Sequence, residues 1–287
     1  MNSSPARGIL SRRAVRRAAA APLLALATLA AGPAAAQQAD LTAGIDAVFV
    51  DYDRTDSPGC ALGVVRDGEL VYARGYGMAN LEHGVPITPG TVFDIGSTSK
   101  QFAATATVLL AEEGRLSLDD EVRKWIPELR DYGAPLTIRH LLHHTSGLRD
   151  YLTLMSLVGT SFDGLTTDDD ALDIIARQRE LNFPPGSEHL YSNSGYFLLS
   201  QIIERASGQS LREYAGTRIF EPLGMDDTHF HDDHTHVVPR RATAYAPLSE
   251  DGAFRIDMSL FEQTGDGAVY TTIDDLVRWD GNFYHPT

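Results

Sequence analysis

The sequence contains a single cysteine among its 287 residues, Cys60. One thiol cannot form a disulfide within the chain, so no internal disulfide is expected. With 43% hydrophobic residues, the chain has enough apolar material for a core of ordinary size. Cys60 lies in the apolar run CALGVV, where we expect a buried, unreactive thiol rather than a nucleophile.

Basic side chains are scarce once the amino terminus is set aside. Residues 1–36 hold five of the 24 basic side chains and no acidic one, which leaves 19 basic against 39 acidic, a net charge of −20. A surface with this balance repels the phosphates of nucleic acids and of anionic membranes. We therefore expect no nucleic-acid partner.

Two common catalytic or cofactor-binding motifs are also absent. No Gly-x-Ser-x-Gly occurs, which argues against an α/β-hydrolase. The segment GYGMAN (75–80) begins like a dinucleotide-binding loop, but Asn80 stands where the third glycine belongs and no helix is expected after it. The sequence therefore predicts neither fold.

The first 36 residues form a pattern of their own. Five arginines precede an Ala/Leu-rich stretch at 18–31, and Ala34-Ala35-Ala36 offers a small-x-small cleavage site, which together predict a secretory signal peptide. Its SRRAVRR segment (11–17) favours the twin-arginine route. The apolar stretch contains Pro22 and is too short to span a bilayer comfortably. We expect no membrane span and a periplasmic or secreted protein.

Hydrophobic periodicity in residues 37–287 predicts a hairpin followed by a mostly helical region. Apolar residues at helical spacing predict a helix from Leu41 to Tyr52, and Asp67-Gly68 predicts the turn of the hairpin. The two strands are expected at 60–66 and 69–75. Because two strands alone are only marginally stable, further strands should follow. The predicted helices cover 101–113, 137–143, 168–178, 195–206, 211–219 and a segment after the Thr272/Asp275 capping box.

The stretch FDIGSTSKQF (93–102) contains the first candidate catalytic pair, Ser97 and Lys100. Residues three apart at the start of a helix lie on one face, about 5–6 Å from each other. A serine hydroxyl becomes nucleophilic when a neighbouring base accepts its proton, and a lysine amine can act as that base. The N–H groups of the helix N-terminus would stabilise the developing negative charge.

A second stretch, PPGSEHLYSNSGYFLL (184–199), places Tyr191 and Asn193 ahead of a predicted helix. A lysine ammonium beside Tyr191 would favour its phenolate, so the tyrosine could share the proton transfer. The Asn193 amide could orient Lys100 or a substrate carbonyl. Taken alone, Tyr191 is more typical of a core aromatic residue, and only the combination with the first pair favours a catalytic interpretation.

Together these segments resemble the serine β-lactamase and penicillin-binding protein superfamily, in its class C β-lactamase-related, D-alanyl-peptidase and esterase branch. Ser97-x-x-Lys100 resembles the first motif and Tyr191-x-Asn193 the second, and the framework segments at 136–148, 202–228 and 265–279 are also similar. The resemblance implies an α+β fold of the β-lactamase/transpeptidase type, with an antiparallel sheet backed by helices and a mostly helical lobe. It also implies an acyl-enzyme on Ser97, with Lys100 and Tyr191 as the acid/base pair. No metal or other cofactor is expected, and the substrate would be a small molecule or derived from peptidoglycan.

The third motif of that superfamily, Lys/His-x-Gly on a carboxy-terminal strand, does not occur after Trp279. The strand with this motif would line the site and grip the substrate. The resemblance therefore implies that residues 37–287 form an incomplete copy of the domain, with its carboxy-terminal strands missing. The sequence does not predict an oligomeric state, nor a choice among D-alanyl peptides, β-lactams and esters.

Two alternatives compete with a serine hydrolase. His229, His231, Asp233 and His234 have the His-x-His-x-Asp-His spacing of zinc hydrolases, but such a site needs ligands well downstream, where His285 is the only histidine. We expect a surface loop there, and metal content after dialysis would decide. The other alternative is a catalytically impaired relative that binds peptidoglycan. The presence of all four candidate site residues argues against it, and the absent third motif argues for it.

Overall fold

The computed structural model describes residues 33–161, 164–249 and 252–286. The predicted signal peptide lies outside these ranges up to residue 32, and the first helix begins at Pro33. Two compact units are distinguished, Met1–Gly44 and Ile45–Thr287. In the part that the structure describes, no helix is long and apolar enough to cross a membrane.

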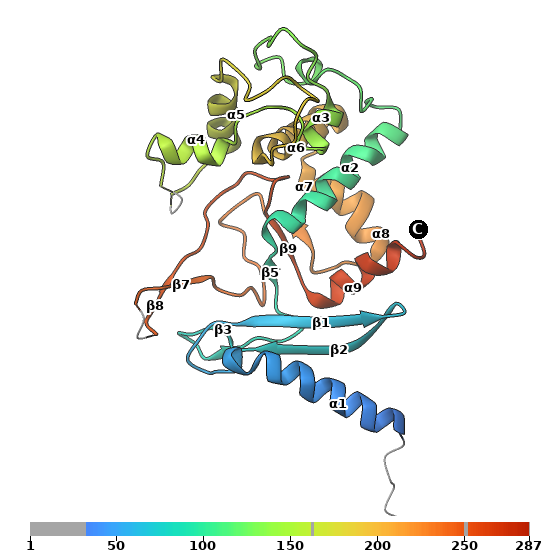
Figure 1. Cartoon of the computed structure of the whole chain (residues 1–287), viewed down its shortest axis with the longest axis vertical. Helices are drawn as coiled ribbons and strands as arrows, with labels where there is room; N and C mark the ends of the chain where they lie inside the picture. Colours follow the sequence, from blue (N-terminus) through green and yellow to red (C-terminus); the bar gives the residue numbers. More distant parts are fainter. Residues whose placement is uncertain (1–32, 162–163, 250–251, 287) are drawn as a thin grey trace, which may run out of the picture. The chain divides into compact units, whose positions relative to one another are not determined.

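The structure combines helices with short antiparallel sheets (Figure 1). The α-helices are α1 (Pro33–Val48), α2 (Lys100–Glu112), α3 (Ile138–Leu142), α4 (Tyr151–Leu157), α5 (Asp168–Ala176), α6 (Asn193–Ser207), α7 (Leu211–Ala215), α8 (Glu221–Leu223) and α9 (Ile273–Asn282). Three short 3₁₀ helices are η1 (Val50–Tyr52), η2 (Gly96–Ser99) and η3 (Val122–Lys124), and η4 (Gly216–Phe220) is a π-helical turn. The strands are β1 (Cys60–Arg66), β2 (Glu69–Tyr76), β3 (Met78–Asn80), β4 (Val85–Pro86), β5 (Phe93–Asp94), β6 (His229–Phe230), β7 (Tyr245–Pro247), β8 (Phe254–Ile256) and β9 (Val269–Thr271).

The predicted hairpin is confirmed, since β1 pairs antiparallel with β2 across Asp67-Gly68. Both turn residues have positive φ angles, 54° and 78°, as the favoured two-residue hairpin turn requires. Helix α9 packs against this hairpin at Gly63, where a Cβ atom would lie 2.6 Å from the Ile273 side chain. The absence of a side chain at Gly63 therefore lets the last helix approach the hairpin.

The core lies around α2 and α6, which pack against each other. Phe102, Ala103, Ala106 and Leu110 on α2 are fully buried. The alanines keep that face of α2 narrow, which allows the close approach of α6. The three-stranded sheet β5-β9-β6 lies near the amino-terminal end of α2, because β5 leads through η2 directly into that helix. Ile95, just after β5, donates its N–H to Val269 on β9.

Several predicted elements differ from the structure. Helix α2 begins at Lys100, and Ser97 lies in the preceding turn η2 rather than in the α-helix. The helix predicted at 211–219 continues through the π-turn η4 into α8. Helix α4 was not predicted, because its seven residues are too few to establish a helical period.

The capping box predicted for α9 is half formed. Thr272 accepts a hydrogen bond from the N–H of Asp275, but the buried Asp275 carboxylate accepts from Asp227 and Thr228 instead of returning to Thr272. The cap therefore also fastens the start of α9 to the segment before β6.

Cys60 is less buried than the sequence predicted. The side chain is partly exposed, because it lines a cavity of about 490 Å³ together with Phe93 and Tyr245. The burial that remains raises the pKa of the thiol, which favours the unreactive protonated form.

Candidate active site

The segment from β5 into α2 positions the first two candidate residues. Asp94 at the end of β5 accepts a hydrogen bond from the N–H of Gly96 at 2.8 Å, which helps to shape the turn η2. Ser97 lies on this turn with its side chain exposed, and Lys100 follows as the first residue of α2 with only 7% of its surface exposed. The exposed hydroxyl and the buried amine are thus held on adjoining turns.

The structure brings all four predicted site residues together. Lys100 Nζ lies 3.1 Å from Ser97 Oγ and 2.9 Å from Asn193 Oδ1. The Tyr191 hydroxyl lies 2.7 Å from the same Ser97 Oγ. One serine oxygen therefore contacts two groups that can exchange protons with it, while the asparagine amide fixes the lysine.

Lys100 has a third acceptor that the sequence did not reveal, the backbone carbonyl oxygen of Asp266 at 2.5 Å. The three acceptors match the three hydrogens of an ammonium group. The amine also lies 4.8 Å from the ring centroid of Tyr191, within the range of a cation–π contact. Lys100 is therefore held in one position from several sides.

Tyr191, just before α6, and Asn193, its first residue, are held by side chains from positions 144 and 150. Asp150 accepts a hydrogen bond from the N–H of Asn193 at 2.6 Å. His144 accepts one from the N–H of Ser192 through Nδ1 and stacks on the Tyr191 ring at 4.6 Å. Burial lowers the pKa of His144, which favours the neutral imidazole that this acceptor role requires. The sequence had placed His144 in the framework segment 136–148, but it gave no sign of the role of Asp150.

Asp266 lies on the loop before β9 and is buried beneath the site. The Tyr151 hydroxyl donates a hydrogen bond to its carboxylate at 2.9 Å. Burial raises the pKa of Asp266 to about 7, an effect opposed by Lys100 and the Tyr151 hydrogen bond. Sequence reasoning assigned this segment to the framework and missed that Asp266 reaches the lysine.

A cavity of about 210 Å³ opens beside Ser97 and Asn193. In the described ranges, the backbone N–H of Ser97 has no hydrogen-bond acceptor, so it can donate to an oxyanion. Ala268, which also lines the cavity, has a φ of 70°, an uncommon conformation for a residue with a side chain. Strained residues of this kind often occur at functional sites.

The histidine segment at 229–234 is not the surface loop that the sequence predicted. His229 lies on β6, and His231 is buried and lines the cavity, with its ring 4.4 Å from that of Tyr270. Burial lowers the pKa values of His229 and His231 to about 4, so both are neutral at neutral pH. The pairing of β6 with β9 draws this part of the segment inwards.

The four residues of the zinc-like spacing do not converge on one point. Among the described residues, one group of three possible metal ligands has its ligand atoms within 4.8 Å of one another. This group is Asp233, His234 and Glu262. His234 Nδ1 lies 2.7 Å from Glu262 Oε1. His229 and His231 pack against the Tyr270 ring instead, so the two halves of the pattern have different neighbours.

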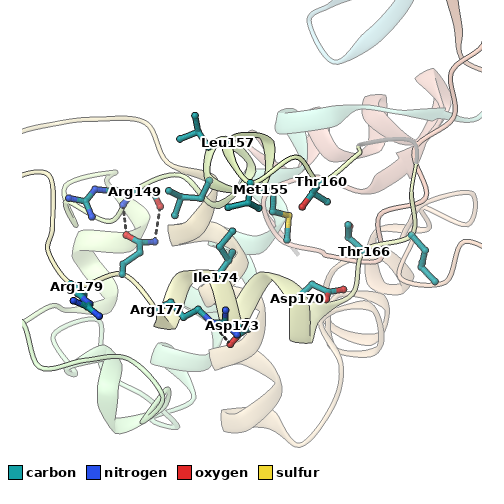
Figure 2. A pocket seen from close by; sticks show the side chains of 14 residues that line it. Arg149, Met155, Leu157, Thr160, Thr166, Asp170, Asp173, Ile174, Arg177 and Arg179 are labelled. Atoms are coloured by element: carbon teal, nitrogen blue, oxygen red, sulfur yellow. Dashed lines mark hydrogen bonds and ion pairs between the residues drawn. The ribbon is translucent and has the colours of Figure 1, made fainter.

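A larger cavity, of about 750 Å³, lies between α4 and α5, with Met155 and Ile174 in its wall (Figure 2). Arg149 and Arg179 lie at one end of it, and Asp170 at the other. None of the four candidate site residues is among the described residues that line it. Because it offers no nucleophile paired with a base, the smaller cavity at Ser97 is the better candidate site.

Comparisons with known proteins identify the family of this chain. Residues 37–284 match the family described as Beta-lactamase. A D-aminopeptidase of Gluconobacter oxydans is 34% identical over 227 residues, which make up 79% of this chain and 42% of that protein. Penicillin-binding protein 4* of Bacillus subtilis is 33% identical over 231 residues, 76% of this chain and 50% of that protein. The chain thus spans about half the length of the curated relatives it matches.

Solved structures show the same similarity. The octameric penicillin-binding protein homologue from Pyrococcus abyssi aligns with a TM-score of 0.74 and 32% identity, over 86% of this chain and 56% of that one. The D-amino acid amidase from Ochrobactrum anthropi, solved with D-phenylalanine, aligns with a TM-score of 0.71 and 27% identity, over 86% of this chain and 71% of that one.

Proposed function

This chain belongs to the β-lactamase and penicillin-binding protein family of serine hydrolases, and we propose that it forms an acyl-enzyme on Ser97. Its fold is the β-lactamase/transpeptidase-like arrangement of helices and antiparallel strands that the sequence predicted. The observation that supports the proposal is the position of Ser97 Oγ within hydrogen-bond distance of both Lys100 and Tyr191.

In the proposed acylation, Ser97 Oγ attacks the substrate carbonyl carbon and passes its proton to the Lys100–Tyr191 pair. Lys100 must be a free amine, or Tyr191 a phenolate, to accept that proton. The electron pair of the carbonyl bond moves onto its oxygen, which the Ser97 N–H stabilises. When the tetrahedral intermediate collapses, the bond to the leaving group breaks and the pair returns the proton to it. Water then takes the place of the leaving group. It attacks the ester carbon and gives a proton to the Lys100–Tyr191 pair, and the pair returns a proton to Ser97 Oγ when the bond to the serine breaks.

For the substrate, we propose an amide or peptide bond next to a D-amino acid, with esters and β-lactams as related acyl donors. The similarity to a D-aminopeptidase and to a D-amino acid amidase supports this class. Peptides derived from peptidoglycan supply such bonds. We further propose that residues 1–36 direct export, so that residues 37–287 act in the periplasm or outside the cell.

The test of the nucleophile is covalent labelling of the full-length protein with a fluorophosphonate probe, followed by mass spectrometry of its peptides. We expect the added mass on the peptide that contains Ser97, and none in the Ser97→Ala variant. Ser156→Ala is the matched control, because Ser156 is exposed on α4 and lines neither the cavity at Ser97 nor the larger one between α4 and α5. Labelling of another serine in the wild-type protein would refute the assignment.

The roles of Lys100 and Tyr191 follow from the same assay run as a time course. Lys100→Ala and Tyr191→Phe should each slow labelling by about 10²–10⁴-fold, the usual contribution of a positioned proton-transfer group. The double variant should be little slower than the slower single variant, since the two groups act as a unit. Additive losses would show that they act in separate steps.

A further inference from the structure

The larger cavity, of about 750 Å³ between α4 and α5, has an apolar wall that is open to solvent (Figure 2). Its volume lies within the usual range for small-molecule sites. Met155 and Ile174 form part of the wall, and two further apolar side chains are strongly exposed, Leu157 at 77% and Val158 at 73%. An apolar ligand would remove these side chains from water, which is energetically favourable.

Arginines line the same cavity. Acidic side chains outnumber basic ones by 39 to 19 in residues 37–287, yet two of these guanidinium groups are unpaired. Arg177 forms an ion pair with Asp173 at 2.7 Å. Among the described residues, neither Arg149 nor Arg179 has an ion-pair partner. The cavity therefore combines an apolar wall with two positive charges that are available to a ligand.

Arg149 is the better placed of the two, because it is half-buried whereas Arg179 is exposed. Its backbone N–H donates to Gln178 Oε1 at 2.9 Å, and its carbonyl oxygen accepts from Gln178 Nε2 at 3.1 Å. These two hydrogen bonds fix the backbone of Arg149 beside the cavity. Its guanidinium group is left to pair with a carboxylate, which can accept two parallel N–H bonds from it.

The charges along the cavity also determine the direction of a ligand. Arg149 and Arg179 lie at one end, and Asp170 lies at the other (Figure 2). The hydroxyl and the N–H of Thr167 both donate to the Asp170 carboxylate and lower its pKa, so it is ionised at neutral pH. An anionic group is therefore attracted to the arginine end and repelled from the other.

We propose that the cavity between α4 and α5 binds a small molecule with an apolar chain and a terminal carboxylate, such as a medium-chain fatty acid. The carboxylate pairs with Arg149 and Arg179, and the chain lies against Met155, Leu157 and Ile174. The described linings of this cavity and of the one at Ser97 share no residue. The proposed ligand site is therefore separate from the proposed acylation.

The test measures the binding of octanoate and of octan-1-ol, which has the same chain length without the charge, to the full-length protein by isothermal titration calorimetry. We expect octanoate to bind about tenfold more tightly or better. Arg149→Gln should weaken octanoate by at least about tenfold, since a hydrogen bond between charged groups is lost, and should leave octan-1-ol within about twofold. Arg66→Gln, exposed at the end of β1 and outside the lining, is the matched control and should change neither affinity.

A second pair of variants tests the apolar wall. Leu157→Glu places a negative charge in the wall at an exposed position, where little packing is lost. The affinity for octanoate should fall about tenfold, as expected for a like charge a few ångströms away. Val237→Glu makes the same change at an apolar position that is 82% exposed and lies outside the lining, and it should have no effect.

Ser97→Ala separates the two cavities, because it should bind octanoate as the wild type does. Loss of octanoate binding in that variant, or after fluorophosphonate labelling, would place the ligand at Ser97 and overturn the inference. Equal affinities for octanoate and octan-1-ol would also overturn it, as would wild-type affinity in Arg149→Gln or Leu157→Glu, or no octanoate binding by the wild type. Labelling of Ser97 tests the proposed function independently of all these results.

Discussion

Lys100 is one of only two lysines in the sequence, beside 22 arginines. The other, Lys124, is exposed and forms an ion pair with Asp120 at the protein surface. An arginine at position 100 could not serve as a proton acceptor, because the guanidinium group does not lose its proton in proteins. The buried amine at this position is therefore the residue-level feature that most clearly supports proton transfer.

Two aspartates on the first turn of α5 have carboxyl pKa values that shift in opposite directions. Burial, together with the nearby carboxylate of Glu204, raises the pKa of Asp168 to about 6. One oxygen of Asp168 is buried without a hydrogen-bond partner among the described residues. Hydrogen bonds from the backbone and hydroxyl of Thr167 instead lower the pKa of Asp170.

The raised pKa of Asp168 predicts a pH-dependent effect on stability. The folded protein binds this proton more tightly than the unfolded chain does. The favourable contribution is therefore complete below about pH 4 and is lost as the pH rises through about 6. Relative to the wild type, Asp168→Asn should gain about 1–3 kcal/mol in free energy of unfolding between pH 4 and 7.5. Urea unfolding at the two pH values measures this difference.

Asp170→Asn is the control on the same helix and should behave in the opposite sense. The lowered pKa of Asp170 contributes stability that is present above its ordinary value of 3.8 and is lost as the pH falls below that value. Relative to the wild type, Asp170→Asn should therefore lose stability as the pH rises through the acidic range below about 4, and it should change little between pH 4 and 7.5. If Asp168→Asn had the same stability relative to the wild type at both pH values, burial would not raise the pKa of the Asp168 carboxyl.

At the scale of elements, the loop at 265–268 runs from the segment after β8 into β9 and supplies a backbone acceptor for Lys100. Gly265 has a φ of 98°, and a Cβ atom there would lie 2.4 Å from the carbonyl oxygen of Tyr196 on α6. Glycine is needed at this point because the loop passes directly against the helix backbone. The loop position, and with it the Asp266 carbonyl, depends on that contact.

Gly265→Ala should therefore lower the free energy of unfolding by about 2–4 kcal/mol, from the strained φ and the steric overlap. It should also slow fluorophosphonate labelling, because the loop must shift away from Lys100. Gly267→Ala is the matched control two residues along the loop, where the nearest atom to an added Cβ is 3.9 Å away. Denaturant unfolding of the two variants should separate them, and equal stabilities would contradict the argument.

At the scale of the whole molecule, α2 joins the candidate site to the hydrophobic core. Its first residue is Lys100, and two residues later the fully buried Phe102 packs on Trp279 at 4.6 Å and on Phe220 at 5.3 Å. The Trp279 indole also donates a hydrogen bond to Gln101. The carboxy-terminal helix and the π-turn thus hold the end of α2 that bears the lysine.

Phe102→Ala should lower the free energy of unfolding by about 3–5 kcal/mol, as expected for a large aromatic side chain removed from a packed core. The cavity left behind should also alter the fluorescence of Trp279 in the folded state. Val108→Ala on the same helix is the control, because Val108 is 40% exposed and its truncation should cost less than about 1 kcal/mol. Similar losses in both variants would show that Phe102 has no special place in the core.

Local features of this protein were determined by the sequence itself. The β1–β2 hairpin, the capped start of α3 and the proximity of Ser97 to Lys100 each depend on atoms within a few residues of one another. Steric limits on φ and ψ and hydrogen bonds to neighbouring residues suffice to specify such features. The resemblance to a known family added Tyr191 and Asn193, which no local rule places beside Ser97.

Tertiary structure decided the rest. The Asp266 carbonyl, the Tyr151 hydroxyl, the His144 ring and buried His231 reach the site from segments far apart in the sequence. Their positions result from the packing of α2 against α6 and from the pairing of β6 with β9, which no spacing along the chain encodes. The histidine segment shows the reason, since a regular spacing of polar residues predicts a metal site only if the backbone turns them to one point. Here His229 and His231 pack against Tyr270, whereas Asp233 and His234 lie beside Glu262.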